Sequence, residues 1–331
     1  MKVLITGATG FVGKALCIKA NDTGVEVTAA VREVVQVFSK QIQQVKITDL
    51  SKKVEWESAL KGVSVVVHVA ARAHIMNDSM ENSLSEFRKV NTEGSLNLAR
   101  QAADAGVKRF IFISSVKVNG EITGRNAPMR SDKKGGARDC FNENDVFIPT
   151  DPYGLSKYEA ERGLLALTKE TGMEVVIIRP PLVYGPGVRA NFASMLKWAK
   201  RGVPLPLGAV HNQRSLVALD NLINFIIHCI AHPKAANEVF LISDGEDVST
   251  TELLQKVAKA FGKKSRLIPV PVYLLTLVAK LIGKSDVASR LFGSLQVDST
   301  KARELLGWKP VITMDEELKE VASAYLAKQK I

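Results

Sequence analysis

Short apolar runs recur through the first half of the chain, and segments of helical length separate them. The runs are rich in valine and isoleucine and cover residues 2–6, 25–31, 63–69, 109–114 and 174–179. They are continuously apolar rather than alternating, as expected of strands buried on both faces of a parallel sheet. Because parallel neighbours need a long crossover, helices are expected between them. The pattern predicts an α/β fold with a doubly wound parallel sheet.

Glycines and prolines punctuate the rest of the chain. Helices are predicted at residues 92–105 and 152–171, because each is followed by a glycine that can stop it, Gly106 or Gly172. After Arg179 prolines and glycines become frequent. This change in composition indicates a smaller lobe that packs over the sheet.

Two domains are therefore expected. The first covers residues 1–180, and the chain returns to it at about 211–243, where residues 238–243 are predicted to form another strand. Residues 181–331 are expected to build mainly the smaller α/β lobe, which would bind substrate. The stretch 125–138 is basic, contains glycine and lacks periodicity, so it is predicted to be a long loop.

The composition excludes several classes of protein. With 46% hydrophobic and 24% charged residues among 331, the chain is expected to fold as an ordinary globular protein. Its three cysteines form no CxxC pair, so reduced thiols are expected and no metal site is predicted. No secretory signal pattern opens the chain, and Pro269, Pro271 and Lys280 interrupt the apolar stretch at 267–282. We expect a cytoplasmic protein without a transmembrane segment.

The formal charge of +11 is compatible with three situations. It would suit a polyanionic partner, a well-solvated surface, or a peripheral contact with acidic lipid. No zinc-finger spacing, basic heptad region or aromatic RNA-binding strand accompanies the charge. No nucleic-acid partner is therefore predicted.

A glycine-rich turn directly follows the first predicted strand. Gly7 would allow a tight strand-to-helix turn, Gly10 would let the backbone approach a pyrophosphate, and Gly13 would let the helix pack closely on the sheet. The helix N-terminus then offers unpaired N–H groups to the anion. The spacing is GxxGxxG, and its position after strand one makes it a candidate dinucleotide site that also includes Thr9, Phe11 and Val12.

The end of the second strand bears on the choice of dinucleotide. An acidic residue there would bind the ribose hydroxyl of NAD, whereas this chain carries Arg32. An arginine can pair with a 2′-phosphate, which favours NADP(H) over NAD(H), or it can stack on adenine with either cofactor. Asp49 and Leu50 are candidates for fixing the adenine. The small residues Ala70 and Ala71 would let the cofactor pass close to the backbone.

Tyr153 and Lys157 stand four residues apart on a predicted helix, so they share one face of it. A nearby ammonium favours the phenolate, and we expect it to lower the pKa of the tyrosine enough for proton transfer near neutral pH. Ser115, just after a predicted strand, can hold a carbonyl or alcohol oxygen against Tyr153. These three residues are the predicted catalytic group.

In order and spacing these motifs resemble the extended short-chain dehydrogenase/reductases over nearly the whole chain. The segments that carry the resemblance are residues 6–13, the strand end His68-Val69-Ala70-Ala71, Asn91, Ser114 with Ser115, residues 153–157, and Arg179 with Pro180. The resemblance implies a Rossmann domain with a C-terminal substrate lobe. It also implies that Val69, Asn91, Ser114 and Pro180 contact the cofactor, together with Tyr153 and Lys157.

The lobe suggests a UDP-sugar substrate. Arg214 stands in a segment similar to the one that clamps the diphosphate in nucleotide-sugar members of the family, and a guanidinium gives bidentate contacts to phosphate. Asn191, Phe192, Leu205 and Leu207 match places that enclose the base, where apolar walls suit a uracil ring. Ser115 and Tyr153, with Lys117 and Arg290, complete the predicted substrate-binding residues.

Ser115 is followed by Val116 and Lys117, which limits the chemistry. The family's dehydratases resemble Thr-Asp-Glu at this place, its decarboxylating members also place an acid nearby, and its GDP-fucose enzymes use a cysteine there. Two reactions stay open, and the resemblance favours the first. One is 4-ketoreduction of a UDP-4-keto-6-deoxy-N-acetylhexosamine for bacterial surface polysaccharide, and the other is 4-epimerisation on bound NAD.

Two further expectations follow from the resemblance. Relatives pair through two helices of the Rossmann domain, here residues 91–105 and 152–171, which implies a homodimer. Some proteins of this fold serve as redox-sensing or assembly modules without turnover. Such a module would be expected to lose Tyr153, Lys157 or the glycines, all of which are present.

Overall fold

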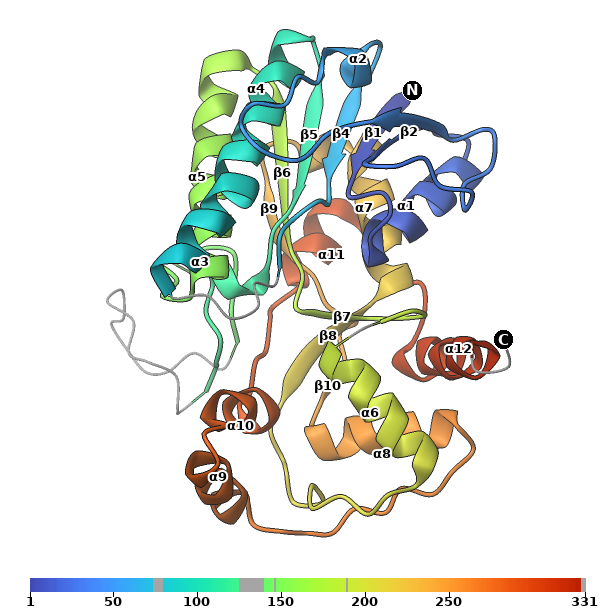
Figure 1. Ribbon diagram of the computed structural model, residues 1–331, viewed down its shortest axis with the longest axis vertical. Coiled ribbons are helices and arrows are strands. Elements are labelled where there is room, and N and C mark those ends of the chain that lie inside the picture. The colour runs from blue at the N-terminus through green and yellow to red at the C-terminus, as the bar shows by residue number, and fades with distance from the viewer. Residues whose placement is uncertain (74–79, 125–139, 146, 189, 329–331) are drawn as a thin grey trace.

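The computed structural model describes residues 1–331 except 74–79, 125–139, 146, 189 and 329–331. The loop predicted at 125–138 therefore lies outside the described residues. A parallel sheet flanked by helices forms one end of the molecule, and a smaller lobe forms the other (Figure 1).

The main sheet has seven strands in the order β3-β2-β1-β4-β5-β6-β9, and every neighbouring pair is parallel. The strands are β1 Lys2–Thr6, β2 Glu26–Val31, β3 Gln43–Lys46, β4 Val65–His68, β5 Arg109–Ile113, β6 Glu174–Arg179 and β9 Val239–Leu241. The predicted doubly wound parallel sheet is thus confirmed. The strand order reverses between β1 and β4, and in such sheets ligands bind beyond the carboxyl ends of the strands at that point.

Both faces of the sheet are covered by helices, which explains the continuously apolar strands. In β1, Val3 and Ile5 belong to one core while Leu4 belongs to the other. The first core is closed by α1 Phe11–Asp22, α7 Leu219–Ala231 and α11 Thr300–Leu306; the second by α2 Glu57–Leu60, α4 Ser95–Asp104 and α5 Pro152–Thr171. The helix predicted at 152–171 has these same bounds.

The helix predicted at 92–105 starts earlier than expected. It is the last part of a longer helical segment made of α3 Met80–Phe87, a π-helical stretch η1 Arg88–Gly94 and then α4. No glycine or proline between residues 80 and 93 stops a helix, so the prediction placed the start too late. The carbonyl of Leu50 lies where a side chain on Gly94 would stand. Such π-turns are often found at functional sites.

The smaller lobe has its own three-stranded sheet, in the order β10-β8-β7. Its strands are β7 Leu182–Tyr184, β8 Arg214–Ala218 and β10 Asp247–Val248; its helices are α6 Ala190–Arg201, α8 Thr250–Ala260, α9 Val272–Leu281, α10 Ser285–Phe292 and α12 Met314–Ala327. Between β8 and β10 the chain returns to the main sheet through α7 and β9. The boundary predicted at residue 180 stays a prediction.

Among the described residues, no helix combines the length and apolar character needed to cross a bilayer.

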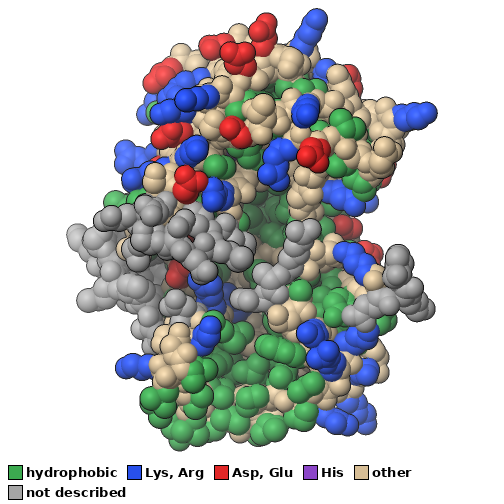
Figure 2. All heavy atoms as spheres, viewed as in Figure 1, with side chains coloured by type: hydrophobic (Ala, Val, Ile, Leu, Met, Phe, Trp, Pro, Cys, Tyr) green, Lys and Arg blue, Asp and Glu red, His purple; other side chains and the backbone are tan. Residues whose placement is uncertain are grey.

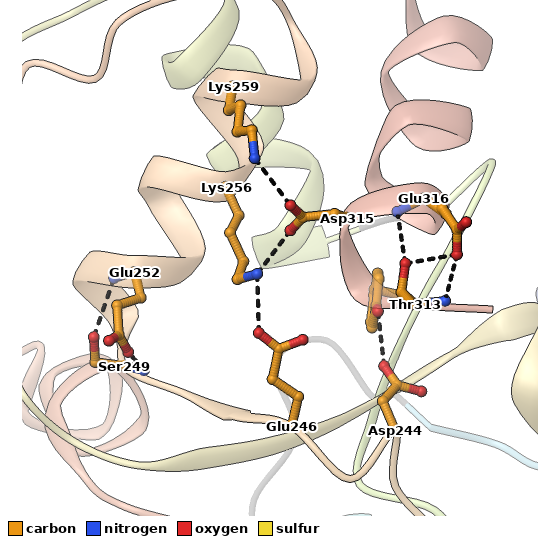
Figure 3. A network of polar contacts seen from close by, with 10 residues as sticks. Asp244, Glu246, Ser249, Glu252, Lys256, Lys259, Thr313, Asp315 and Glu316 are labelled. Carbon is orange, nitrogen blue, oxygen red and sulfur yellow. Dashed lines mark hydrogen bonds and ion pairs between the residues drawn. The ribbon is translucent and has the colours of Figure 1, made fainter. Parts of the chain in front are cut away.

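Charged side chains join α8 to α12 at the edge of the lobe (Figure 3). Asp315 of α12 accepts from Lys256 at 2.7 Å and from Lys259 at 3.1 Å. Both helices also begin with a capping box, Ser249 with Glu252 and Thr313 with Glu316. Each box satisfies backbone N–H groups that a helix start leaves unpaired.

Candidate active site

The glycine turn folds as its residue types require. Gly7 has φ +67°, and a Cβ there would lie 2.8 Å from the backbone nitrogen of Ala70. A Cβ on Gly13 would overlap the carbonyl oxygen of Gly7. Gly10 precedes α1 without a side-chain cap. The N–H groups that open α1 are therefore available to an anion, which fits a dinucleotide pyrophosphate.

The other predicted cofactor residues lie around this turn, and their roles stay predictions. Thr9 is exposed, while Phe11 and Val12 pack against the sheet core. Arg32 is exposed just beyond β2. Asp49 accepts from the backbone N–H of Ser51 at 2.6 Å.

A buried histidine links the glycine turn to the helical segment beside it. The Nδ1 of His68 lies 2.7 Å from the Thr6 hydroxyl, and its Nε2 lies 2.9 Å from the Ser95 hydroxyl. Ser95 donates its own proton to the Asn91 carbonyl, so Nε2 must carry the ring proton and Thr6 must donate to Nδ1. Thr6 also accepts from the Ala70 N–H at 3.3 Å. Burial lowers the pKa of His68 to about 3, which keeps the ring neutral.

Asn91, predicted to contact the cofactor, is fully buried in η1 and holds two parts of the site together. Its amide nitrogen donates to the Arg72 carbonyl and to the Ser156 hydroxyl, both at 3.0 Å. Its oxygen accepts from the Arg72 N–H at 2.8 Å. Asn91 thus fixes the segment after β4 against α5. Its contact with a cofactor stays a prediction.

The structure brings the three predicted catalytic residues together. Ser115 follows β5, close enough to Tyr153 at the start of α5 for its hydroxyl to lower the pKa of the phenol. Lys157 lies one turn further along α5, where its ammonium donates to the Ile113 carbonyl at 2.8 Å. It also stands 4.2 Å from the centre of the Phe112 ring. Ser114 and Pro180 complete this edge: the Ile178 carbonyl accepts from Ser114, and the Pro180 carbonyl accepts from Val116.

In this arrangement the pKa of Tyr153 is not lowered by Lys157 as predicted. Burial and the charge of Asp151 raise the pKa of Tyr153 to about 12, and the bond to Ser115 lowers it only in part. Burial lowers the pKa of Lys157 to about 7, since its ammonium is desolvated. The predicted lowering of the tyrosine pKa is therefore wrong for this state. Tyr153 is a neutral phenol here, suited to donating a proton.

Asp151 is a site residue that the sequence analysis missed. It caps α5 by accepting from the Gly154 N–H at 3.0 Å, and it accepts from Lys117 at 3.0 Å. Lys117, predicted to bind substrate, also pairs with Glu121. The sequence does carry a signal for the cap, since Asp before Pro152 is typical of a helix start. The pairing with Lys117, 34 residues away, has no local signal.

A buried ion pair braces the catalytic edge. Arg179, at the end of β6, makes two-pronged contacts with Glu161 of α5, the shortest 2.6 Å, and a third bond to Asn119 at 3.1 Å. The guanidinium therefore joins α5, β6 and the segment that follows Ser115. Removing either partner of such a pair leaves the other charge buried and unpaired.

The predicted substrate residues are distributed over the lobe. Arg214 donates to the carbonyls of Arg290 at 2.8 Å and Gly293 at 3.0 Å, and burial lowers its pKa. The Arg290 side chain is exposed. Phe192 is buried and stacked on Tyr184 in the lobe core, with ring centres 5.8 Å apart. The side chain of Asn191 lies outside the described residues.

Leu205 and Leu207 belong to the same lobe. The Leu205 backbone bonds to Arg266 and Ile268, and the Leu207 carbonyl accepts from Thr251 at 2.6 Å. Both therefore lie in the packed part of the lobe, and their contact with a base stays a prediction.

Three carboxylates approach one another where α7 meets α12. Oxygens of Asp220, Glu317 and Glu320 lie within 4.8 Å of each other. Burial, with the charges of Asp220 and Glu320, raises the pKa of Glu317 to about 8. Near neutral pH Glu317 therefore carries a proton, which relieves its repulsion with the carboxylates of Asp220 and Glu320.

A Ser-Tyr-Lys group and a glycine-rich helix start on one doubly wound sheet are the arrangement typical of the short-chain dehydrogenase/reductases. The sequence agrees with this class. The chain belongs to the NAD dependent epimerase/dehydratase family, whose model matches residues 3–243. The family resemblance predicted from the motifs is thus confirmed, and the protein is an enzyme related to the sugar-nucleotide epimerases.

Relatives cover most of the chain. It is 49% identical to the UDP-glucose 4-epimerase of Vibrio cholerae over 98% of this chain and 95% of that protein. It is 29% identical to the N-acetyl-alpha-D-glucosaminyl-diphospho-ditrans,octacis-undecaprenol 4-epimerase of Escherichia coli O157:H7, over 90% of this chain and 88% of that one. Both relatives are named as 4-epimerases.

Solved structures share the fold. The UDP-glucose 4-epimerase of Thermotoga maritima with UDP-glucose superposes with a TM-score of 0.73 at 23% identity, covering 99% of this chain and 100% of that one. The UDP-glucuronic acid 4-epimerase of Bacillus cereus with NAD gives a TM-score of 0.76 at 21% identity, covering 99% of each chain.

Proposed function

We propose that this protein epimerises a UDP-hexose at C4. The observation that carries the proposal is the 49% identity to a 4-epimerase over almost the whole length of a chain in which Ser115, Tyr153 and Lys157 lie together. The sequence motifs alone favoured 4-ketoreduction. The agreement of the relatives on 4-epimerisation reverses that preference.

The chain's own residues account for the proton at O4. In the oxidation step Tyr153 would act as the phenolate, its own proton having passed to solvent, and would take the O4 proton. The phenol so formed would return that proton as the ketone is reduced, while Ser115 holds the same oxygen. The dinucleotide, when bound, would supply the hydride acceptor and donor for C4. Lys157 would hold the ribose hydroxyls of the cofactor, and Arg214 the diphosphate of the substrate.

A second candidate is the 4-ketoreductase, in which fresh NADPH or NADH reduces a UDP-4-keto-6-deoxy-N-acetylhexosamine. The observation that favours it is Arg32, exposed beyond β2, where a partner for a 2′-phosphate would be useful. An enzyme that exchanges its cofactor at each turnover gains from such a contact. An epimerase that retains NAD has no need of it.

One experiment separates the two candidates. Purified protein is analysed for bound dinucleotide and then given UDP-galactose, or its N-acetyl analogue, without added cofactor. Conversion to the C4 epimer supports the epimerase. No conversion, together with NADPH or NADH consumption that depends on a UDP-4-keto-6-deoxy sugar, would establish the reductase and overturn the proposal.

We also propose that the enzyme is a homodimer paired through α4 and α5, as the family resemblance implies. Light scattering coupled to gel filtration measures the mass directly. A monomer across the concentrations used for assay would contradict the proposal.

A further inference from the structure

Helix α9 carries a stripe of large apolar side chains that face solvent. Tyr273 is 70% exposed, Leu277 53% and Leu281 78%, and these residues recur at every fourth position. Leu274 and Val278 widen the stripe, and Ile282 continues it beyond the helix end. In a helix this spacing places them on one side.

The opposite side of α9 is apolar as well. Val272 and Leu275 pack against the lobe core. A helix that is apolar all round is ordinarily buried, yet α9 has no buried residue. Figure 2 shows hydrophobic side chains gathered along the free end of the lobe, where α9 lies. Contiguous patches of this kind mark a surface that binds another apolar phase.

Basic residues are frequent in the segment of the sequence that carries the patch. From residue 262 to 294 the sequence has six lysines and arginines, at 263, 264, 266, 280, 284 and 290, against one acid, Asp286. Lys280, in the last turn of α9, and Lys284, just after the helix, are exposed next to the apolar stripe. Apolar residues with lysines at their margin are the pattern of a helix that lies in a membrane interface.

We propose that α9, with α10, docks the enzyme on the surface of an anionic lipid bilayer. Tyr273, Leu277 and Leu281 enter the headgroup region, and the lysines contact acidic headgroups. A second copy of the chain would fit this surface less well, because pairing two such faces would bring the lysines of both copies close together. A bilayer supplies apolar depth and opposite charge at once.

The docking face adjoins the predicted diphosphate residue. Arg214 donates to the carbonyls of Arg290 and Gly293, at the end of α10. A bilayer held by α9 and α10 therefore lies close to the part of the lobe expected to hold the substrate's diphosphate. Catalysis on a soluble UDP-sugar does not require this contact, so the two proposals fail independently.

The test is co-sedimentation of the full-length protein with vesicles of phosphatidylcholine alone or mixed with phosphatidylglycerol. Binding is expected only to the anionic vesicles, and added salt should weaken it. Leu281→Asn should lower the partition coefficient about tenfold, since one leucine leaves the apolar layer. Lys280→Gln should lower it about fivefold.

Matched variants outside the patch serve as controls. Val311→Asn changes an apolar residue that is 59% exposed, and Lys234→Gln changes an exposed lysine of the short helix η3 Pro233–Ala235. Both should bind vesicles as the natural protein does. Circular dichroism and turnover of a soluble substrate check that every variant is folded.

Three outcomes would overturn the proposal: no sedimentation with either vesicle, equal binding by Leu281→Asn, or equal binding to the uncharged vesicles. A fourth comes from light scattering. If Leu281→Asn turns a dimer into a monomer, the patch is an interface between two copies instead.

Discussion

Tyr153 stands between a hydroxyl that can stabilise its phenolate and a carboxylate that opposes it. The Ser115 hydroxyl lowers the pKa of the phenol, whereas the charge of Asp151 raises it. Phe87 packs edge-on against the ring, 5.8 Å between centres. The orientation of the tyrosine is therefore fixed independently of its hydroxyl.

This geometry makes Tyr153→Phe a clean test of the proton transfer. The ring contacts are retained and only the proton donor is lost, so kcat should fall about a hundredfold or more. Dinucleotide binding, followed by fluorescence, should hardly change. Turnover close to that of the natural enzyme would remove Tyr153 from the mechanism.

Replacing Asp151 should move the pH profile of turnover. Asp151→Asn keeps a side chain able to cap α5 but removes the charge that disfavours the phenolate. The pKa of Tyr153 should then fall, and the acidic limb of the kcat profile should shift to lower pH by up to about one unit. An unshifted profile in a folded variant would show that Asp151 only caps the helix.

His68 makes stability depend on pH. Its folded pKa of about 3 lies below the ordinary value of 6.5, so below pH 6.5 the unfolded chain binds a proton that the native chain refuses. The free energy of unfolding should therefore decrease as pH falls from 6.5 towards 3, by up to about 1.4 kcal/mol per unit. Urea unfolding at pH 7 and 5 should show a shallower dependence for His68→Asn. The exposed His211→Asn should retain the full slope.

Residues with local signatures were predictable from the sequence, and those that act across the fold were not. Gly7, Tyr153 and Lys157 belong to short motifs whose spacing already implies their place. The bond between Thr6 and His68 joins residues 62 apart, and that between Asn91 and Ser156 residues 65 apart. Such partners are chosen by packing, which no local pattern shows.

Among the elements, the junction between η1 and α4 packs closely against a neighbouring backbone segment. A methyl group on Gly94 would meet the carbonyl of Leu50, which belongs to the segment after β3. Gly94→Ala should therefore lower the free energy of unfolding by about 1–3 kcal/mol, as overpacking does.

A second helix glycine gives the matched control for Gly94. At Gly163 of α5 the added methyl would meet only the side chain of Leu96, which can change rotamer. Gly163→Ala should consequently cost much less in the same denaturant experiment. Equal losses for the two variants would contradict the special role of the Leu50 carbonyl.

The long strands of the main sheet could be predicted from the sequence, whereas the short strands of the smaller lobe could not. The apolar runs that became β1, β5 and β6 were recognisable because burial on both faces makes them continuously hydrophobic. β7 and β10 have three and two residues. Segments this short carry no period, and only their neighbours in space make them strands.

At the scale of the whole molecule, cofactor and substrate are expected to bind different lobes. NAD, on the main sheet, and UDP, on the smaller lobe, should each raise the free energy of unfolding by about 2.7 kcal/mol at a hundred times its dissociation constant. Arg214→Ala should abolish the shift with UDP while leaving the shift with NAD. The exposed Arg201→Ala should retain both. Loss of both shifts in Arg214→Ala would mean that the arginine supports the fold rather than the diphosphate.

The order of the strands in the main sheet also governs how the chain can fold as it is made. β6 ends at Arg179, but its neighbour β9 begins only at Val239, after β7, α6, β8 and α7 have been made. Until then β6 is an open edge of the kind that pairs with other chains. Ala302, Leu306 and Trp308 complete the same core later still. The half of the molecule built on the main sheet, first in the sequence, is thus completed close to last, and its β6 edge stays open longest in a growing chain.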